Sequence, residues 1–171
     1  MSQIEPNVCI DWNECPELAA DPSLLDRVMS LFDGEENDEE ALDDDEQTWG
    51  ASRVVYAYFL PDEDEPFYIG KSWSTTVYSR LMAKDKAPMD QYLRSEYSIS
   101  RDDLVVFAGK PKVSAGRRLT RQLLADIESL LIFDLRPEWN KASTRNRGHR
   151  ESLVVECVGD WPHRRSMFLS H

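Results

Sequence analysis

The chain has 171 residues, of which 41% are hydrophobic and 30% are charged, a composition that allows one globular domain and excludes wholesale disorder. The formal net charge is −12, no apolar run approaches the roughly 18 residues of a membrane span, and the first residues do not resemble a secretory signal. Three scattered cysteines, Cys9, Cys15 and Cys157, provide neither a disulfide framework nor zinc-ligand spacing, so we expect a reduced, cytoplasmic protein.

The acidic residues are concentrated in the first part of the chain. Residues 1–50 contain 16 acids and a single base, Arg27, for a net charge of −15, whereas residues 51–171 contain 16 acids and 19 bases, for +3. We therefore predict an acidic N-terminal extension, 1–50, joined to a mildly basic domain, 51–171. The overall acidity would argue against nucleic-acid binding, but the charge of the domain does not.

Two features stand out within the extension. The apolar pattern of residues 24–33 predicts one short helix, with Asp21 as the N-cap and Gly34 as the terminator. Residues 33–46 then place ten acids in fourteen positions, a density at which like charges repel and stay solvated. Such a run is either a partly disordered linker or an arm that covers a basic site or recruits a basic protein partner.

The domain is expected to begin with a β-hairpin. Residues 53–60 are β-branched and aromatic and predict a strand, and residues 67–71 predict a second, shorter strand. The acidic residues 61–66 between them, with a proline at each end, predict a longer hairpin loop.

Short helices and a third strand follow. Helical spacing over residues 77–81, with Ser74 or Thr75 as the N-cap, predicts the first helix. A second short helix is predicted over residues 88–97, which open with proline. Residues 103–109 have the composition of a third strand.

The strongest helical signal covers residues 115–135, and Pro137 ends it because the residue before a proline avoids the α-region. A basic stretch over 141–150 and a last strand over 152–159 follow. These elements predict an α+β domain with a small, mainly antiparallel sheet flanked by helices. The apolar stripe of the long helix consists of Leu119, Leu123, Leu124, Ile127, Leu130 and Leu131.

Several motifs occur in an order that one nuclease family shares. Val54-Val55-Tyr56 is followed, after eleven residues, by Tyr68-Ile69-Gly70-Lys71. Arg80 lies in the first predicted helix and Glu128 in the long one, after which comes Pro137-Glu138-Trp139-Asn140. This combination resembles the GIY-YIG nucleases, which are named after their paired strands.

The resemblance covers roughly half of the chain, residues 53–142, and implies the fold and the reaction of these enzymes. The implied reaction is metal-dependent hydrolysis of a phosphodiester backbone, with DNA as the expected substrate and RNA left open. By position, Glu128 would be the ligand of Mg²⁺ or Mn²⁺. Tyr56 and Tyr68 would lie beside the scissile phosphate, and Tyr56 would help to deprotonate the attacking water.

Further residues carry over in the same way. Arg80 would hold the phosphate, Asn140 would brace the site, and Lys71 matches the lysine that follows YIG in the repair branch. The sequence departs from the family pattern at Val54, which stands where the family name has glycine. It also departs at Lys84, one helical turn after Arg80, where many members carry a histidine or tyrosine that assists the base.

The chemistry of these residue types agrees with the implied roles. A hard divalent cation prefers carboxylate oxygen, and one carboxylate with waters and a phosphate is a normal magnesium arrangement. Arginine offers planar, bidentate contacts to phosphate. A tyrosine with an ordinary pKa near 10 is a poor base at neutral pH, so it needs cationic neighbours.

Basic residues flank the implied site. Such clusters usually form a solvated surface, but beside phosphate chemistry they would also follow a nucleic-acid backbone, with binding that weakens steeply as salt is added. The candidates for nucleic-acid contact are Arg117, Arg121, Lys141, Arg145, Arg147 and Arg150, with Arg118 and His149 beside them.

Each motif taken alone is also typical of a structural residue: a buried strand tyrosine, a surface arginine, a solvated glutamate or a turn asparagine. Two alternatives therefore stay open. One is a catalytically inactive module of the same fold that binds nucleic acid or a protein. The other is a chain whose acidic extension is the functional part and binds basic proteins.

Overall fold

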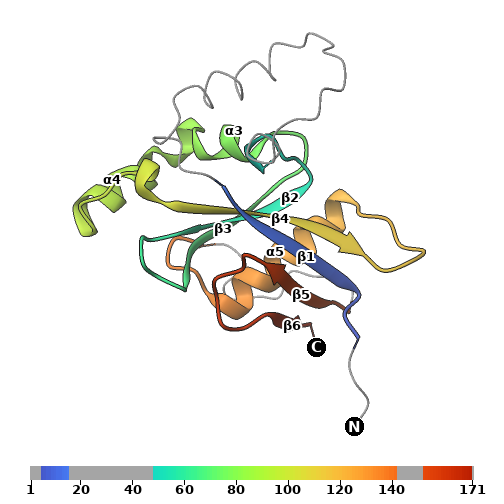
Figure 1. Ribbon diagram of the computed structural model, residues 1–171. Helices are drawn as coiled ribbons and strands as arrows, with labels where there is room; N and C mark the ends of the chain where they lie inside the picture. Colours follow the sequence, from blue (N-terminus) through green and yellow to red (C-terminus); the bar gives the residue numbers. More distant parts are fainter. Residues whose placement is uncertain (1–4, 16–47, 142–151, 171) are drawn as a thin grey trace.

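A six-stranded sheet forms the centre of the structure, a computed structural model that describes residues 5–15, 48–141 and 152–170 (Figure 1). The strands lie in the order β3-β2-β4-β1-β5-β6. The β1–β5 pair is parallel, and the other four pairs are antiparallel. The strands are β1 (Val8–Cys15), β2 (Val54–Phe59), β3 (Pro66–Ser72), β4 (Val105–Val113), β5 (Val154–Gly159) and β6 (Met167–Leu169).

Strand β1 lies inside the sheet, between β4 and β5, and we did not predict it. It pairs with β4 from Val8↔Val113 to Cys15↔Val106 and with β5 from Val8↔Val155 onward. The folded unit therefore includes residues 8–15, which we had assigned to the extension. The partner also explains why β4 continues to Val113, beyond the predicted end at residue 109, because the last residues of β4 pair with the first residues of β1.

Helices cover both faces of the sheet, so each face has its own apolar core. Helix α5 (Arg121–Leu135) lies below the sheet in Figure 1 and α3 (Val77–Leu81) lies above it. Helix α4 (Ala87–Glu96) lies at the left-hand end of the sheet and adds Met89 and Leu93 to the core on the α3 face. All six residues of β2 are buried, because this strand faces a core on either side. The core under α5 includes Ile10, Trp12, Val55, Ile69, Ile127 and Leu131, and the other includes Tyr56, Tyr58, Val77, Leu81 and Leu93.

The predicted starts of two helices need correction. The cap of α3 is Thr76, whose hydroxyl accepts from Ser79 N at 3.2 Å, and not Ser74 or Thr75. Helix α5 begins at residue 121, six residues later than predicted, because Gly116 takes a positive φ of 82° that turns the chain there. The Thr120 hydroxyl then caps the helix by accepting from Leu123 N at 3.1 Å.

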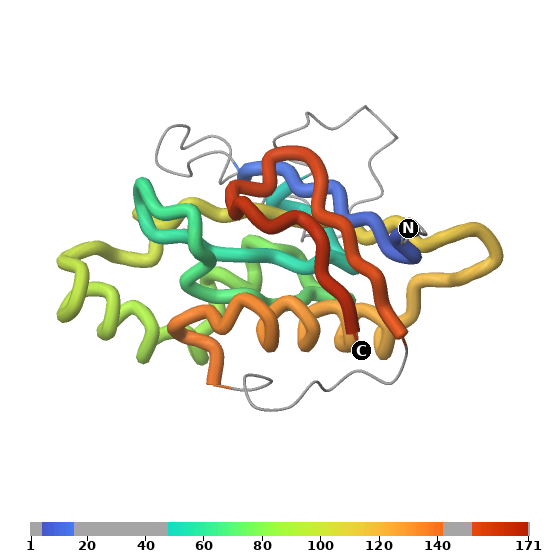
Figure 2. The backbone as a smooth tube through the Cα atoms, turned by 90° about the horizontal axis from the view of Figure 1, so that it is seen from below, coloured from blue at the N-terminus to red at the C-terminus, as the bar shows by residue number. Residues whose placement is uncertain are grey.

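The α+β class is confirmed, as are the strands predicted over 53–60 and 67–71 and the short helix predicted over 88–97. The predicted helix over 24–33 and the acidic run over 33–46 lie outside the described residues. None of the helices in the described ranges is long and apolar enough to cross a membrane. The β4–α5 connection projects from the end of the molecule opposite α4 (Figures 1 and 2).

Deleting residues 1–15 should abolish cooperative unfolding, because β1 hydrogen-bonds to strands on both sides and carries Ile10 and Trp12, both fully buried, into the core. Deleting residues 1–4, which precede β1, is the matched control and should leave the urea transition in place. A truncated chain without residues 1–15 that still shows a cooperative transition and a native circular dichroism spectrum would contradict this prediction.

Candidate functional site

The candidate site begins with a close approach between two strands. Tyr56 on β2 pairs with Gly70 on β3, and the Tyr56 ring lies directly over the glycine. A Cβ atom at position 70 would lie 2.5 Å from both Cζ and the hydroxyl oxygen of Tyr56, far inside van der Waals contact. The absence of a side chain at position 70 therefore lets the Tyr56 ring reach across β3, which is the edge strand of the sheet.

Three tyrosine rings gather around this approach. The ring centroids of Tyr56 and Tyr68 are 6.1 Å apart, and Tyr58 lies 5.3 Å from each. Arg80 on α3 donates from Nε to the Tyr56 hydroxyl at 3.4 Å, and the Tyr56 and Tyr68 hydroxyls are close enough to shift each other's pKa. The tyrosines predicted to lie beside a phosphate and the arginine predicted to hold it are thus brought together.

Burial raises the pKa of both hydroxyls in this pair, but their neighbours act on them in opposite directions. Arg80 and Tyr68 lower the pKa of Tyr56 and partly offset the effect of burial. Tyr56, in contrast, raises the pKa of Tyr68. Of the two, Tyr56 is therefore the hydroxyl that ionises more readily, although burial keeps its pKa above the ordinary value.

Glu128 reaches the same edge from the other side of the sheet. It lies on α5 and forms an ion pair with Lys71 of β3, with its own side chain 15% exposed. Its negative charge raises the pKa of Tyr56 and of Tyr68, so the carboxylate lies within electrostatic range of both hydroxyls. The structure thus brings Glu128 and Lys71, two residues predicted for the site, into direct contact.

The side chains at this edge of the sheet provide few ligands for a metal ion. Within the described residues there is no group of three or more His, Cys, Asp or Glu side chains that could enclose a metal ion. Glu128 is the one predicted ligand, and one of its oxygens is engaged by Lys71. These residues fit Mg²⁺ or Mn²⁺ on the condition that water and a bound phosphate supply the remaining ligands.

Asn140, which follows the end of α5, forms hydrogen bonds to the edge strand of the sheet. Its Oδ1 accepts from Ile69 N at 2.8 Å, and its Nδ2 donates to Ile69 O at 2.8 Å, so the carboxamide pairs with β3 as a neighbouring strand would. The backbone N–H of Trp139 also donates to Phe67 O at 3.0 Å. Both contacts hold the strand that carries Tyr68 and Lys71, which is the geometry that a bracing residue requires.

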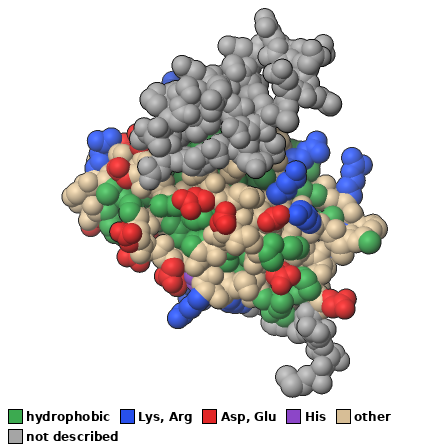
Figure 3. Space-filling view, in the orientation of Figure 1, with side chains coloured by type: hydrophobic (Ala, Val, Ile, Leu, Met, Phe, Trp, Pro, Cys, Tyr) green, Lys and Arg blue, Asp and Glu red, His purple; other side chains and the backbone are tan. Residues whose placement is uncertain are grey.

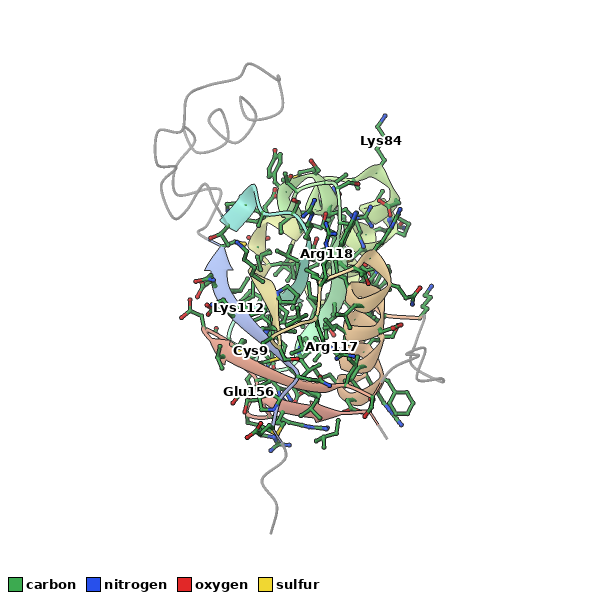
Figure 4. All side chains as sticks on the ribbon, turned by 90° about the vertical axis from the view of Figure 1, so that its right-hand side faces the viewer. Cys9, Lys84, Lys112, Arg117, Arg118 and Glu156 are labelled. Carbon is green, nitrogen blue, oxygen red and sulfur yellow. The ribbon has the colours of Figure 1, made fainter. Side chains whose placement is uncertain are left out.

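The lysine that faces the tyrosines is Lys86 and not Lys84. Lys84 is exposed and points away from the molecule (Figure 4). Lys86 is 6% exposed, and its Nζ lies 3.8 Å from the centroid of the Tyr68 ring. We had placed Lys84 by assuming that the helix continues one turn past Arg80, but α3 ends at Leu81. Ala83 is then extended, and a short 3₁₀ turn, η1 (Lys84–Lys86), directs the third residue inward; the spacing alone carried no signal of this.

The residues predicted to contact nucleic acid are placed in part. Arg117 and Arg121 are exposed at the β4–α5 connection, and Lys141 lies over the Trp139 ring at 5.6 Å. Lys112, paired with Asp11 at 2.8 Å, is also exposed near this end of β4. Lys and Arg side chains gather on this side of the molecule (Figure 3). The other exposed basic residues there are Lys110 and Arg118, whereas Arg145, Arg147 and Arg150 lie outside the described residues.

Replacing Gly70 with alanine should displace the Tyr56 ring, because the new methyl group would overlap it. We expect the free energy of unfolding, measured in urea, to fall by about 1–3 kcal/mol. In a Tyr56→Ala background the same substitution should cost much less, since the overlapping ring is gone. An equal loss of stability in both backgrounds would show that the close approach does not limit position 70.

The chain was also compared with known proteins. No family model matches it, and neither the curated proteins nor the solved structures contain a match. The resemblance to the GIY-YIG nucleases thus rests on the sequence motifs alone.

Proposed function

We propose that the chain is a metal-dependent endonuclease that hydrolyses DNA phosphodiester bonds with a GIY-YIG-type site. The observation that carries this proposal is the convergence, at one edge of the sheet, of side chains from four separate elements. These are Tyr56 on β2, Tyr68 on β3, Arg80 on α3 and Glu128 on α5. The residues lie up to 72 positions apart in the sequence, and a purely structural role would not require these particular types to meet.

Each residue has a role that its contacts support. Arg80, fixed by Tyr56, would bind a phosphate oxygen of the substrate, and Lys71 would add a second positive charge. Tyr56, with its hydroxyl directed to the sheet edge, would orient the attacking water and receive its proton. Glu128 would hold Mg²⁺ or Mn²⁺, which when bound supplies positive charge to the phosphate and to the leaving oxygen.

DNA contact would extend from this site along the β4–α5 connection. Residues 109–122 contain five bases and no acid, and all five are exposed. A phosphate backbone that crosses the β3 edge would meet these charges beyond the N-terminal end of α5. Backbone contacts of this kind do not distinguish DNA from RNA, so RNA stays open as a substrate.

The alternative is an inactive module of the same shape that binds nucleic acid or a protein. The observation in its favour is the Lys71–Glu128 ion pair, which engages the one predicted metal ligand with a cation of the protein itself. The two functions differ in one result: the inactive module would retain DNA without cutting it, whatever divalent metal is added.

Replacing Glu128 with alanine should lower DNA cleavage in Mg²⁺ or Mn²⁺ by about 100-fold or more, because the charge that holds the metal is lost. Tyr56→Phe and Arg80→Ala should have losses of similar size, since both act on the same phosphate. Glu156→Gln, on β5 near the other end of the sheet, is the matched control and should cut as the wild type does. Equal cleavage by wild type and Glu128→Ala would point to a contaminating nuclease and refute the proposal.

We further propose that the acidic run over 33–46 restrains nucleic-acid binding. Because β1 lies within residues 1–50, charge removal tests this better than deletion does. Replacing the ten acids with Asn and Gln should tighten DNA binding at low salt, and the difference should shrink as salt is added. Fluorescence anisotropy with a labelled duplex measures both. Unchanged affinity at low salt would instead favour a linker, and binding of a basic protein by the wild type alone would favour the recruiting role.

A further inference from the structure

Four aromatic rings form a cluster beside the candidate site. They are Phe67 on β3, Tyr92 on α4, Tyr97 at the C-terminal end of α4 and Trp139 in the turn after α5. The Trp139 ring centroid lies 5.1 Å from that of Tyr92 and 6.2 Å from that of Phe67, and the Tyr97 centroid lies 6.2 Å from those of Phe67 and Tyr92. Phe67 is buried, whereas Tyr92 and Trp139 are only partly buried and Tyr97 is 37% exposed. Three of the four rings therefore reach the surface.

Glu138 holds the two tyrosines of this cluster by their hydroxyl groups. Tyr92 donates to one oxygen of the carboxylate, and Tyr97 donates to the other at 2.7 Å. The bonds to Glu138 raise the pKa of both phenols, that of Tyr97 to about 12, so the hydroxyls stay protonated at neutral pH. Because both hydroxyls are engaged by Glu138, the surface that the tyrosines offer to a ligand is aromatic.

The ring cluster continues directly from the candidate site. Phe67 precedes Tyr68 in β3, a step of about 3.3 Å along the strand. Trp139 precedes Asn140, whose carboxamide pairs with Ile69, and the backbone N–H of Trp139 donates to Phe67 O at 3.0 Å. A nucleic-acid strand with a phosphate beside Tyr68 would therefore meet the rings with a neighbouring nucleotide.

The charges around the rings favour a base over a phosphate in this place. Glu138 and Glu96 are exposed acids whose charges act on both tyrosines, and they would repel a phosphate group. The nearby cation is Lys141, whose Nζ lies 5.6 Å from the centroid of the Trp139 ring. An uncharged, planar nucleobase meets no such repulsion, and every base has a π-face that stacks on aromatic side chains.

We propose that Tyr92, Tyr97 and Trp139 form a stacking surface for an unpaired nucleobase next to the cleaved phosphate. The inference rests on the proposed nuclease function and names a substrate class for it, DNA with a single-stranded segment beside the position of cleavage. Bases inside a duplex are already stacked on their neighbours, so exposing a face to a protein ring costs unstacking energy. An unpaired base is free of this cost and is the form that aromatic side chains bind.

The affinities for two labelled DNA probes test the proposal. One probe is a blunt duplex, and the other is the same duplex with a single-stranded deoxyadenosine overhang. Fluorescence anisotropy in the absence of divalent metal measures both affinities without cleavage, and the wild type should bind the overhang probe more tightly. Trp139→Leu, which keeps an apolar side chain against Phe67 and Tyr92, should lower the affinity for the overhang probe by about 5- to 100-fold and leave that for the blunt duplex unchanged.

Further variants separate the aromatic ring from other properties of the surface. Tyr97→Leu removes the most exposed ring and should also weaken the preference for the overhang, so it replaces Trp139→Leu if that variant does not fold. Tyr97→Phe loses the bond to Glu138 but keeps the ring, and should retain the preference. Val158→Ser, at an equally exposed apolar residue on β5, away from β3, is the matched control and should bind both probes as the wild type does.

A fluorescent base reports the stacking itself. With 2-aminopurine as the first unpaired base of the overhang, binding of the wild type should quench its emission, and binding of Trp139→Leu should quench it much less. Equal affinity of the wild type for the two probes, or equal losses on both probes in Trp139→Leu, would overturn the inference. Binding of a lysine-rich peptide that requires Trp139, without any preference for the overhang, would also overturn it and assign the rings to a protein partner.

The outcomes for the stacking surface and for the nuclease proposal are distinguishable. A wild type that prefers the overhang through Trp139 but cuts no DNA would refute the nuclease proposal and support the stacking surface as a binding site. A wild type that cuts DNA but binds and cuts both probes alike would refute the stacking surface and leave the nuclease proposal in place.

Discussion

The close approach of the Tyr56 ring to Gly70 is the constraint on which the candidate site depends. With no Cβ at position 70, the ring crosses the backbone of the edge strand and places its hydroxyl beside Arg80 and Tyr68. Any larger residue there would force the ring or the strand to shift, because its Cβ atom would lie only 2.5 Å from atoms of the ring. One hydrogen atom in place of a side chain thus decides whether β2 can contribute a polar group to the edge.

The two-sided packing of the sheet explains why the polar groups meet at β3. Arg80 and Lys86 belong to the layer above the sheet, and Glu128 belongs to α5 below it (Figure 1). The two layers are separated by a buried sheet everywhere except at its edges, so residues from both can meet only there. The edge strand itself is held by Asn140, which satisfies the N–H and C=O of Ile69 that would otherwise be free to pair with another chain.

Local patterns in the sequence predicted the elements whose signals are short-range. The strands over 53–60 and 67–71 and the leucine stripe of α5 follow from side-chain periodicity, and the end of α5 follows from Pro137. Strand β1 was missed although Val8, Ile10 and Trp12 alternate with more polar residues as in a half-buried strand, because the acidic composition of residues 1–50 led us to treat them as one extension. Its place in the sheet is set by pairing with β4, about a hundred residues away, and no local pattern contains that information.

The residues of the candidate site also divide into those that the sequence predicted and those that depend on the folded backbone. Tyr56, Tyr68, Arg80, Lys71 and Glu128 were picked out by their order in the sequence, and the fold brings them together. Lys86 could not be found in this way, because its inward direction depends on where α3 ends and on the extended backbone of Ala83. A helix extended by one turn gives Lys84 instead, and that residue points into solvent (Figure 4).

The central claim is that Glu128, at the β3 edge, holds a divalent cation against a phosphate bound by Arg80. It is tested most directly by a crystal structure of the chain with Mn²⁺ and a short DNA duplex, with data collected at the manganese absorption edge. The account predicts an anomalous peak about 2.0–2.2 Å from a Glu128 oxygen, with Lys71 turned away from that oxygen and a phosphate beside Arg80. Bound DNA with the Lys71–Glu128 pair intact and no peak at Glu128 would contradict it.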